Sequence, residues 1–539
     1  MGIHRSALLR VLILALAAVA LVLAASRWPG DIQVGSASSS DEAGTSIPRA
    51  ESEPILVPIE EQVRVCPGPE RVGLADSAVR EGEQEVTVRA RAAPVQALPA
   101  GVTAATGSTT EPRADGSIEV RTADETPAAV TDARTTEVGA VVGDGTGVHV
   151  VAQGSLAPGL SAAQMYLGDT DEQLGLALTP CQGPQDESWL IGGGGQAGHS
   201  ERLVLLNPGQ SAVTAEISVL GWTTDPGEDS GGAEVTLEPG AREILLLDAL
   251  APSEASPVVR VVSSGGAVSA FLGDRFLEGT TDQGTELTAP VAPPSVEQMI
   301  VGFEVPRGPA DSATVRVAVP GAEQAVVEVG ALTASGSVPL TQEVTLVEGR
   351  GTADIAVSDL PQGIYALTVS SDEELVAAAR VRSETDGQGR QDVAWAPAAL
   401  PLGALSGTPL PQVDRGQRVS YALDLVAPRG GSVRLISTDR DGITREEVLE
   451  VSAGQLLTRD LGTATGIWLV PGPEEAQMYA AVRGEAEVVS RPADDSVSLD
   501  NAAPSASPPT SDRVSLVSVL PLSELGVHRS VATLTPVLP

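Results

Sequence analysis

From Gln62 onward, short apolar stretches alternate with turn residues along the chain. Residues 86–90 and 258–262 are rich in valine, and Gly or Pro follows each within a few positions. Short runs of this kind, bounded by turn residues and rich in β-branched side chains, indicate strands rather than helices. The pattern therefore predicts an all-β protein.

Similar segments recur at a regular distance. Asn207-Pro208-Gly209, Val319-Pro320-Gly321 and Ala427-Pro428-Arg429-Gly430 each follow one strand-like run and precede another. A further strand-like run ends close to a proline in every copy, at Pro67, Pro180, Pro290, Pro397 and Pro521. The spacings give a period of about 110 residues, which indicates repeated structural units.

A period of this length that holds about seven short strands is the size of an immunoglobulin-like β-sandwich. Asp441-Gly442, between the apolar runs 433–437 and 443–451, is typical of a hairpin turn. We therefore expect tandem immunoglobulin-like sandwich repeats, with a β-propeller of two four-stranded blades per period as the alternative. The expected modules are 62–182, 183–290, 291–397 and 398–539, the last with a Pro/Ser-rich insert at 500–512.

The N-terminus has the charge pattern of an export segment. Arg5 and Arg10 precede an apolar run at 11–25, and Arg27 ends it. We expect a cytoplasmic n-region (1–10), a membrane anchor or signal peptide (11–27) and a flexible linker (28–61). Either way, residue 28 onward is expected outside the cytoplasm, anchored in the plasma membrane or, alternatively, secreted after cleavage.

Composition narrows the classes of partner. The 539 residues require several cores, and because only 2% are aromatic these must be filled by Val, Leu, Ala and Ile. The chain has 33 basic residues, all arginine, against 71 acidic ones, a net charge of −38. Such a surface repels phosphate backbones, which excludes unassisted nucleic-acid binding.

Several stretches resemble a known family. Cys66-Pro67-Gly68-Pro69 after an export segment, Cys181, Ser188-Trp189-Leu190-Ile191-Gly192-Gly193 and residues 203–209 (LVLLNPG) are similar to the actinobacterial exported family called domain of unknown function 5719. The resemblance runs from about residue 62 to the C-terminus, and it implies a β-rich extracytoplasmic envelope protein. It carries over no catalytic residue.

The two cysteines are Cys66 and Cys181, each in a Cys-x-Gly-Pro motif. Cysteines of exported chains usually pair, so we expect a disulfide, with two buried free thiols as the alternative. The pairing requires either that 63–66 and 174–181 lie in one sheet or that equivalent points converge on a propeller axis. Two cysteines and four scattered histidines have no metal-ligand spacing, so neither a metal site nor a cofactor is expected.

Catalytic signals are weak. The chain has no Gly-x-Ser-x-Gly motif, and it has no lysine for a phosphate-binding loop. The glycine run 192–195 with His199 is interpreted as a turn, and 169–172 and 439–441 do not match a calcium loop. Trp189, Trp395 and Trp468 are candidate ligand-contacting aromatics, although core packing is the simpler interpretation.

The sequence therefore favours a non-enzymatic cell-envelope protein that acts as a structural spacer or protein-interaction scaffold. A carbohydrate-binding accessory in cell-wall polysaccharide assembly is the first alternative, and a wall-polymer hydrolase is the second. The expected partners are envelope proteins or wall glycans, with membrane contact through the N-terminal segment.

Overall fold

The structure is a computed structural model in which Pro54–Pro539 form one compact unit. The predicted anchor (11–27) and most of the linker (28–61) lie outside the described residues, as does the insert 500–512. None of the helices among the described residues is long and apolar enough to cross a membrane. The described residues are 55–70, 84–99, 102, 116–122, 127–131, 137–143, 145–170, 173–194, 198–222, 231–252, 254–306, 313–340, 344–357, 360–412, 418–472, 477–489 and 513–531.

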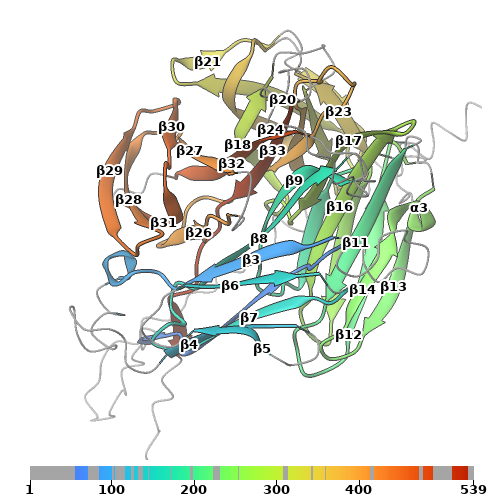
Figure 1. Cartoon of the computed structure of the whole chain (residues 1–539). Coiled ribbons are helices and arrows are strands. Elements are labelled where there is room, and N and C mark those ends of the chain that lie inside the picture. The colour runs from blue at the N-terminus through green and yellow to red at the C-terminus, as the bar shows by residue number, and fades with distance from the viewer. Residues whose placement is uncertain are drawn as a thin grey trace, which may run out of the picture. The chain divides into compact units, whose positions relative to one another are not determined.

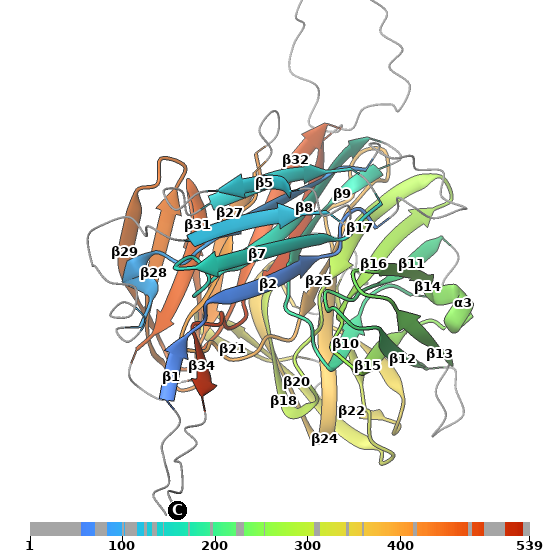
Figure 2. The ribbon, with the colours of Figure 1, turned by 90° about the horizontal axis from the view of Figure 1, so that it is seen from below.

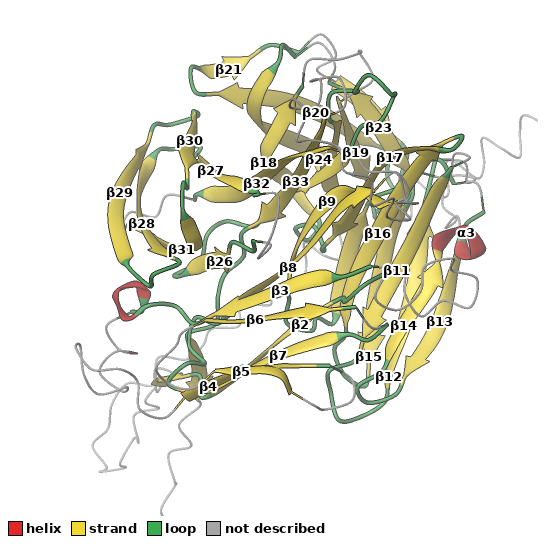
Figure 3. Cartoon of the chain, in the orientation of Figure 1, coloured by secondary structure: helices red, strands yellow, loops and turns green. Residues whose placement is uncertain are grey.

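Nearly all regular structure is β, and the strands fall into four sets in chain order (Figures 1 and 3). The first set is β2 (Glu61–Cys66), β3 (Val86–Arg91), β4 (Gly116–Arg121), β5 (Pro127–Thr131), β6 (Glu137–Val142), β7 (Val148–Gly154), β8 (Ser161–Thr170) and β9 (Gln173–Pro180). The second is β10 (Glu187–Ile191), β11 (His199–Leu206), β12 (Val213–Leu220), β13 (Gly231–Leu237), β14 (Arg242–Leu246), β15 (Val258–Ser264), β16 (Ser269–Glu278) and β17 (Thr281–Thr288).

The remaining elements complete this pattern. The third set is β18 (Ser295–Val305), β19 (Ala313–Ala318), β20 (Ala325–Thr333), β21 (Gly336–Val338), β22 (Val344–Val347), β23 (Thr352–Ala356), β24 (Gly363–Arg382) and β25 (Val393–Pro397). The fourth is β26 (Ser406–Pro409), β27 (Ser420–Val426), β28 (Gly431–Asp439), β29 (Thr444–Val451), β30 (Leu456–Asp460), β31 (Ala464–Pro471), β32 (Tyr479–Val489) and β33 (Arg513–Pro521). Outside the sets lie β1 (Ile55–Pro58), β34 (His528–Val531) and the one-turn helices η1 (Val95–Ala97) and α3 (Leu247–Leu250).

One topology recurs in every set. In the second set, one sheet has the order β10-β15-β12-β13 and the other has the order β14-β11-β16-β17. The first and fourth sets repeat this order strand for strand. In the third set the long strand β24 serves both sheets: its first half pairs with β18 and β20, and its second half pairs with β19 and β25.

Each set folds as a sandwich because both sheets bury an apolar face. In the second set, side chains of β10, β12 and β15 meet side chains of β11 and β16 in one core made of Leu, Val, Ile and Ala. Alternating inward residues of two facing sheets are the defining feature of a β-sandwich. The predicted sandwich repeats are therefore confirmed, and sheets that face each other across a core distinguish them from propeller blades.

The four sets converge on their eighth strands. β9 contacts β17 and β33, and β25 contacts the same two strands, so these four strands form a closed ring of neighbours. We call β9, β17, β25 and β33 the central strands. Thr179 Oγ1 donates to the carbonyl of Leu287 at 2.9 Å, and the Leu178 amide donates to Ser518 Oγ at 2.9 Å. The sandwiches therefore share a junction at their inner edges, instead of forming an end-to-end string.

The two ends of the unit are joined to each other. β1 pairs antiparallel with β34, and the two strands lie side by side in Figure 2. The Ile59 amide bonds to the carbonyl of Val527, and the Gly159 amide bonds to the carbonyl of Gly526 at 2.8 Å. Pairing of an early strand with a late one closes the arrangement at the seam between the first and fourth sets.

The recurrent prolines have a structural meaning, with one exception. Pro180, Pro397 and Pro521 are the last residues of central strands, and Pro290 lies two residues after β17. Proline lacks the N–H that a ladder needs, so it suits a strand end. Pro67 instead follows β2, the first strand of its set, and so grouping it with the other four prolines is wrong.

Candidate functional site

The disulfide joins the beginning and the end of the first set. Cys66 and Cys181 are bonded with an S–S distance of 1.98 Å and a Cα–Cα distance of 4.4 Å, which confirms the predicted pairing. Their neighbours Val65 and Gln182 exchange two backbone hydrogen bonds of 2.7 and 2.9 Å. The expectation that the flanking segments lie in one sheet is wrong, because β2 and β9 belong to the two different sheets of the sandwich.

The three candidate tryptophans are buried. Trp395 in β25 is 2% exposed, Trp468 in β31 is 1% exposed, and Trp189 in β10 is 4% exposed. Trp189 and Trp395 belong to one apolar cluster between the second and third sets, and Trp468 packs between the first and fourth. The ligand-contacting role is therefore corrected for Trp395 and Trp468, since neither ring has a face open to a sugar. Trp189 differs because it lines a pocket.

That pocket, which we call the axial pocket, lies where the central strands end. It has a volume of about 570 Å³ and is lined by residues that follow all four central strands: 182–185, 290–294, 398–400 and 521–524. Residues 187–189 and Arg64 complete its wall. Prolines from three of these segments, and alanine and leucine from 398–400, make much of this wall apolar, and the convergence of four repeats is what creates the space.

The axial pocket carries one arginine without a partner. Among the described residues, the Arg64 side chain forms neither a hydrogen bond nor an ion pair, and its Nε is a buried donor with no acceptor. Burial lowers the pKa of Arg64 to about 10, so it remains charged at neutral pH. Trp189 is held by its Nε1, which donates to Glu187 at 3.0 Å. An unpaired cation beside an aromatic residue can bind an anionic ligand.

A second polar site lies among the central strands themselves. The buried Asp392 carboxylate accepts backbone N–H groups of Leu176, Thr285, Val393 and Val517, one from each central strand, at 2.9–3.4 Å. Burial raises the pKa of Asp392 to about 8, although the four N–H bonds favour the ionised form and lower it. One carboxylate thus holds all four sets together.

Asp392 has a buried acidic neighbour. Glu286 of β17 accepts a hydrogen bond from Ser518 Oγ at 3.0 Å, and burial raises its pKa well above the usual value, helped by the Asp392 charge. Gly284 has a φ of 107°, and a Cβ there would lie 2.5 Å from Asp392 Oδ1, so this close approach requires glycine.

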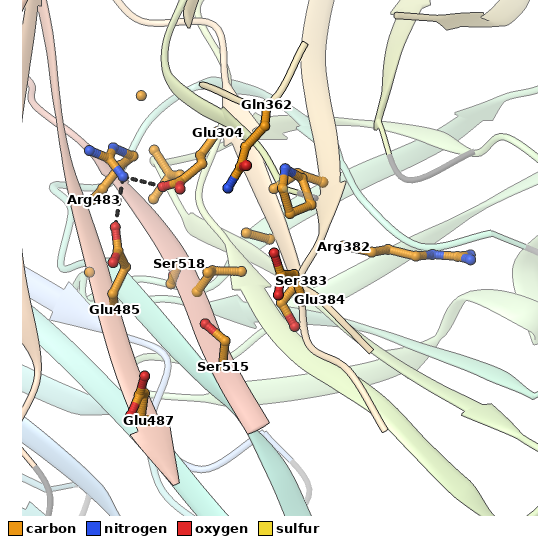
Figure 4. Close-up of a pocket in the computed structure, with 17 residues that line it drawn as sticks. Glu304, Gln362, Arg382, Ser383, Glu384, Arg483, Glu485, Glu487, Ser515 and Ser518 are labelled. Atoms are coloured by element: carbon orange, nitrogen blue, oxygen red, sulfur yellow. Dashed lines mark hydrogen bonds and ion pairs between the residues drawn. The ribbon is translucent and has the colours of Figure 1, made fainter. Parts of the chain in front are cut away.

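Figure 4 shows a third polar site, at the seam between the third and fourth sets. It is a pocket of about 220 Å³ between β18, β24, β32 and β33. Arg483 pairs there with Glu304 and Glu485, and its Nε lies 2.6 Å from the buried Asp424 Oδ2. Burial raises the pKa of both Asp424 and Glu304, whereas Arg483 opposes that shift. Because three carboxylates already satisfy Arg483, this arrangement is a brace between two sandwiches.

The weaker sequence candidates have structural roles of their own. Asp439 Oδ1 accepts the amides of Asp441 and Ile443, and Arg445 lies 3.0 Å from its Oδ2, so this carboxylate organises the predicted hairpin turn. In the other candidate calcium segment, 171–172 lie outside the described residues. Gly193 and Gly194 donate their amides to buried carboxylates on β11 and β16, and Gly195 lies outside the described residues.

Sequence reasoning missed the residues that create these polar sites. Asp392 precedes a strand as one acidic residue among 71, and its partners lie more than 100 residues away in three of the four cases. The available signal was Asp392 directly before the recurrent proline-ending strand.

The architecture is therefore that of an all-β protein built from four sandwiches around shared central strands. The model of a family of unknown function, DUF5719, matches residues 128–461. The match covers more than half of the chain, which therefore belongs to that family, as the resemblance in its sequence indicated. No curated protein matches the chain.

Solved structures give only distant likenesses. The crystal structure of Thermotoga maritima 1070 matches with 17% identity and a TM-score of 0.18, over 20% of this chain and 95% of that one. The BSP domain of a biofilm-associated protein matches with 10% identity and a TM-score of 0.11, over 88% of this chain and 99% of that one. A tetra-tandem repeat of a large adhesion protein matches with 14% identity and a TM-score of 0.11, over 79% of this chain and 93% of that one. At these TM-scores the likenesses support no functional argument.

Proposed function

We propose that this chain is a non-enzymatic, extracytoplasmic cell-envelope protein that acts as a structural scaffold. The observation that carries the proposal is the Asp392 junction, where one buried carboxylate bonds to all four central strands. A scaffold must hold its contact surfaces at fixed positions. The shared buried junction fixes the four sandwiches relative to one another and so fixes the surfaces that they carry. Arg483 adds a polar brace at one seam.

The contact surfaces would be formed by large apolar side chains that are exposed to solvent. Trp222 is 71% exposed, and Leu346 in β22 is 62% exposed. Val326 lies directly opposite Leu346 in the β20–β22 ladder and is also exposed. Large exposed side chains of this kind are common at protein contact sites.

Complementation of a deletion strain tests the scaffold role. Leu346→Glu should reduce complementation because it places a charge on a contact surface, whereas Glu384→Gln should complement fully, because this exposed carboxylate lines the pocket beside Arg483 without pairing with it. Glu373→Gln, at another surface carboxylate, serves as the matched control for the glutamate substitution. If the Glu-to-Gln variant at the pocket keeps the wild-type melting temperature but does not complement, the proposal is overturned in favour of catalysis. Turnover of wall-polymer fragments by the purified chain would overturn it as well.

The proposed location rests on the N-terminal charge pattern and on the disulfide, since structural disulfides persist in oxidising compartments. A reporter fused after Pro539 should be active outside the plasma membrane and inactive in the cytoplasm. Cell fractionation then separates the two forms of the proposal: an anchored chain stays with the membrane, and a cleaved one appears in the medium.

A glycan-binding accessory role is the second candidate, because Trp189 and the unpaired Arg64 line the axial pocket. Glycan-array and calorimetric binding with anionic and neutral wall fragments tests it. Trp189→Ala should abolish binding, and Arg64→Gln should weaken binding of anionic fragments only. Arg260 contacts the Trp189 ring without lining the pocket, so Arg260→Gln is the control. Absence of binding by the wild-type chain removes this candidate.

A further inference from the structure

Three side chains with metal-binding atoms converge inside the second set. His199 and Glu201 are two positions apart on β11 and so share one face of the sheet. Asp274 on β16 is the direct cross-strand partner of Glu201. His199 Nδ1 lies 3.1 Å from Asp274 Oδ1 and 3.7 Å from Glu201 Oε1, and the three ligand atoms all lie within 4.8 Å of one another.

This cluster has an electrostatic imbalance. The Glu201 and Asp274 side chains are 2% and 1% exposed, and carboxylates directly opposite each other in a sheet repel. Asp248 adds a further negative charge that acts on Glu201. The Gly194 amide and His199 oppose this repulsion at Glu201, and His199 and Arg380 oppose it at Asp274. A divalent cation between the carboxylates would remove the repulsion.

We propose that His199 Nδ1, Glu201 Oε1 and Asp274 Oδ1 bind one divalent transition-metal ion, with Zn²⁺ as the best fit. One imidazole nitrogen and two carboxylate oxygens are ligands that zinc accepts, whereas Ca²⁺ and Mg²⁺ prefer oxygen alone. Tetrahedral zinc with bonds of about 2.0–2.1 Å places its ligand atoms about 3.3 Å apart. The distances from His199 Nδ1 to Asp274 Oδ1 and to Glu201 Oε1, 3.1 and 3.7 Å, lie on either side of that value.

Surrounding groups hold the two carboxylates in this orientation. Asp274 Oδ2 accepts the Gly193 amide and Trp395 Nε1, each at 3.1 Å, and this leaves Oδ1 directed at His199. The Gly194 amide donates to Glu201 Oε1 at 2.7 Å. Such outer contacts fix ligand orientation at metal sites.

The position of the cluster indicates a structural ion. The His199 ring stacks on Phe276 with centroids 4.2 Å apart, so an aromatic residue covers one face of the imidazole ring. Trp395 belongs to the third set, so the ion would stabilise both the β11–β16 pair and the seam between the second and third sets. The proposal is independent of the scaffold role, because a metal ion would stabilise the fold whatever the chain binds.

Metal analysis of the purified full-length chain tests the site. After removal of metals with a chelator, titration with ZnCl₂ should show one ion per chain by calorimetry and by elemental analysis, and Zn²⁺ should raise the melting temperature. His199→Gln, Glu201→Gln and Asp274→Asn should each weaken binding by at least about tenfold. Glu286→Gln replaces the carboxylate opposite Asp274 on the other neighbouring strand, outside the three ligands, and should bind Zn²⁺ like the wild type.

Two measurements on the wild-type chain keep the test decisive if a variant does not fold. Co²⁺ should give the visible absorption bands of a tetrahedral site, and anomalous diffraction at the zinc edge should place the ion between His199 and Asp274. The alternative is a hydrogen bond that the His199 Nδ1–H donates to Asp274 Oδ1 in the absence of metal. The proposal would be overturned if the wild-type chain bound no Zn²⁺, a result that would establish the alternative. It would also be overturned if all variants bound Zn²⁺ equally or if the ion lay elsewhere, because either result would indicate another site.

Discussion

At the scale of single residues, the structure depends on buried carboxylates that use backbone groups as partners. Asp392 exchanges water for four amides from four strands, and these hydrogen bonds oppose the effect of burial on its pKa without cancelling it. Because each donor comes from a different set, the bonds form only when all four sets are in place. The residue therefore couples local order to the assembly of the unit.

Removing this acceptor should destabilise the whole unit. In Asp392→Ala, four buried amides lose their partner, and each unsatisfied buried group costs roughly 1–3 kcal/mol. We expect the free energy of unfolding, measured in urea, to fall by several kcal/mol. Asp372 accepts one amide at the surface, and Asp372→Ala should cost well under half as much. Equal losses in the two variants would contradict a special role for Asp392.

Stability should fall as pH rises through the neutral range. Asp392, with a pKa raised to about 8, and Glu286, with a pKa raised well above its usual value, hold protons in the folded state. The unfolded chain releases them near pH 4, so the free energy of unfolding decreases from about pH 4 toward pH 8 and then levels for Asp392. Melting temperatures between pH 5 and 8 measure this slope. Glu286→Gln should flatten it, and the exposed Glu297→Gln should not.

At the scale of elements, the sequence predicts strands well and their neighbours poorly. The Asp441-Gly442 hairpin is present as β28 and β29, because turn chemistry and alternation are local properties. The recurrent prolines mark the ends of central strands for the same reason. Which sheet β2 and β9 join depends on contacts far apart in the chain, and there the prediction was wrong. The His199 cluster was missed because its carboxylates meet only through strand pairing.

The disulfide should stabilise the first set most. It closes a sequence separation of 115 residues, for which chain entropy gives about 4–5 kcal/mol as an upper estimate. In Cys181→Ser we expect a lower melting temperature and faster hydrogen exchange in β2 and β9, with exchange in β28 and β29 little changed. Cys66→Ser should behave identically. Two freely alkylated thiols in the wild-type chain purified without reductant, or unchanged melting of both variants, would refute this role.

At the scale of the whole described unit, the sandwiches gain stability from shared cores. Val426 and Ala481 of the fourth set belong to the core of the third, and Val204 and Phe271 of the second set belong to that of the first. A repeat period read from sequence indicates how many units exist. It does not show that their inner edges meet, because β-strand alternation is the same in a string of modules and in a closed arrangement.

Closure at the β1–β34 seam should be sensitive to one small residue. A Cβ at Gly526 would lie 2.4 Å from Gln62 Nε2 and 2.9 Å from Ile59 Cδ1, so Gly526→Val must push the ends of these two side chains away from the C-terminal segment. We expect faster hydrogen exchange in β1 and β34 and a lower melting temperature. Gly321 has nothing within 4 Å of the same added atom, which makes Gly321→Val the matched control. If exchange at the seam is the same in both variants, close packing at Gly526 contributes nothing to closure of the β1–β34 seam.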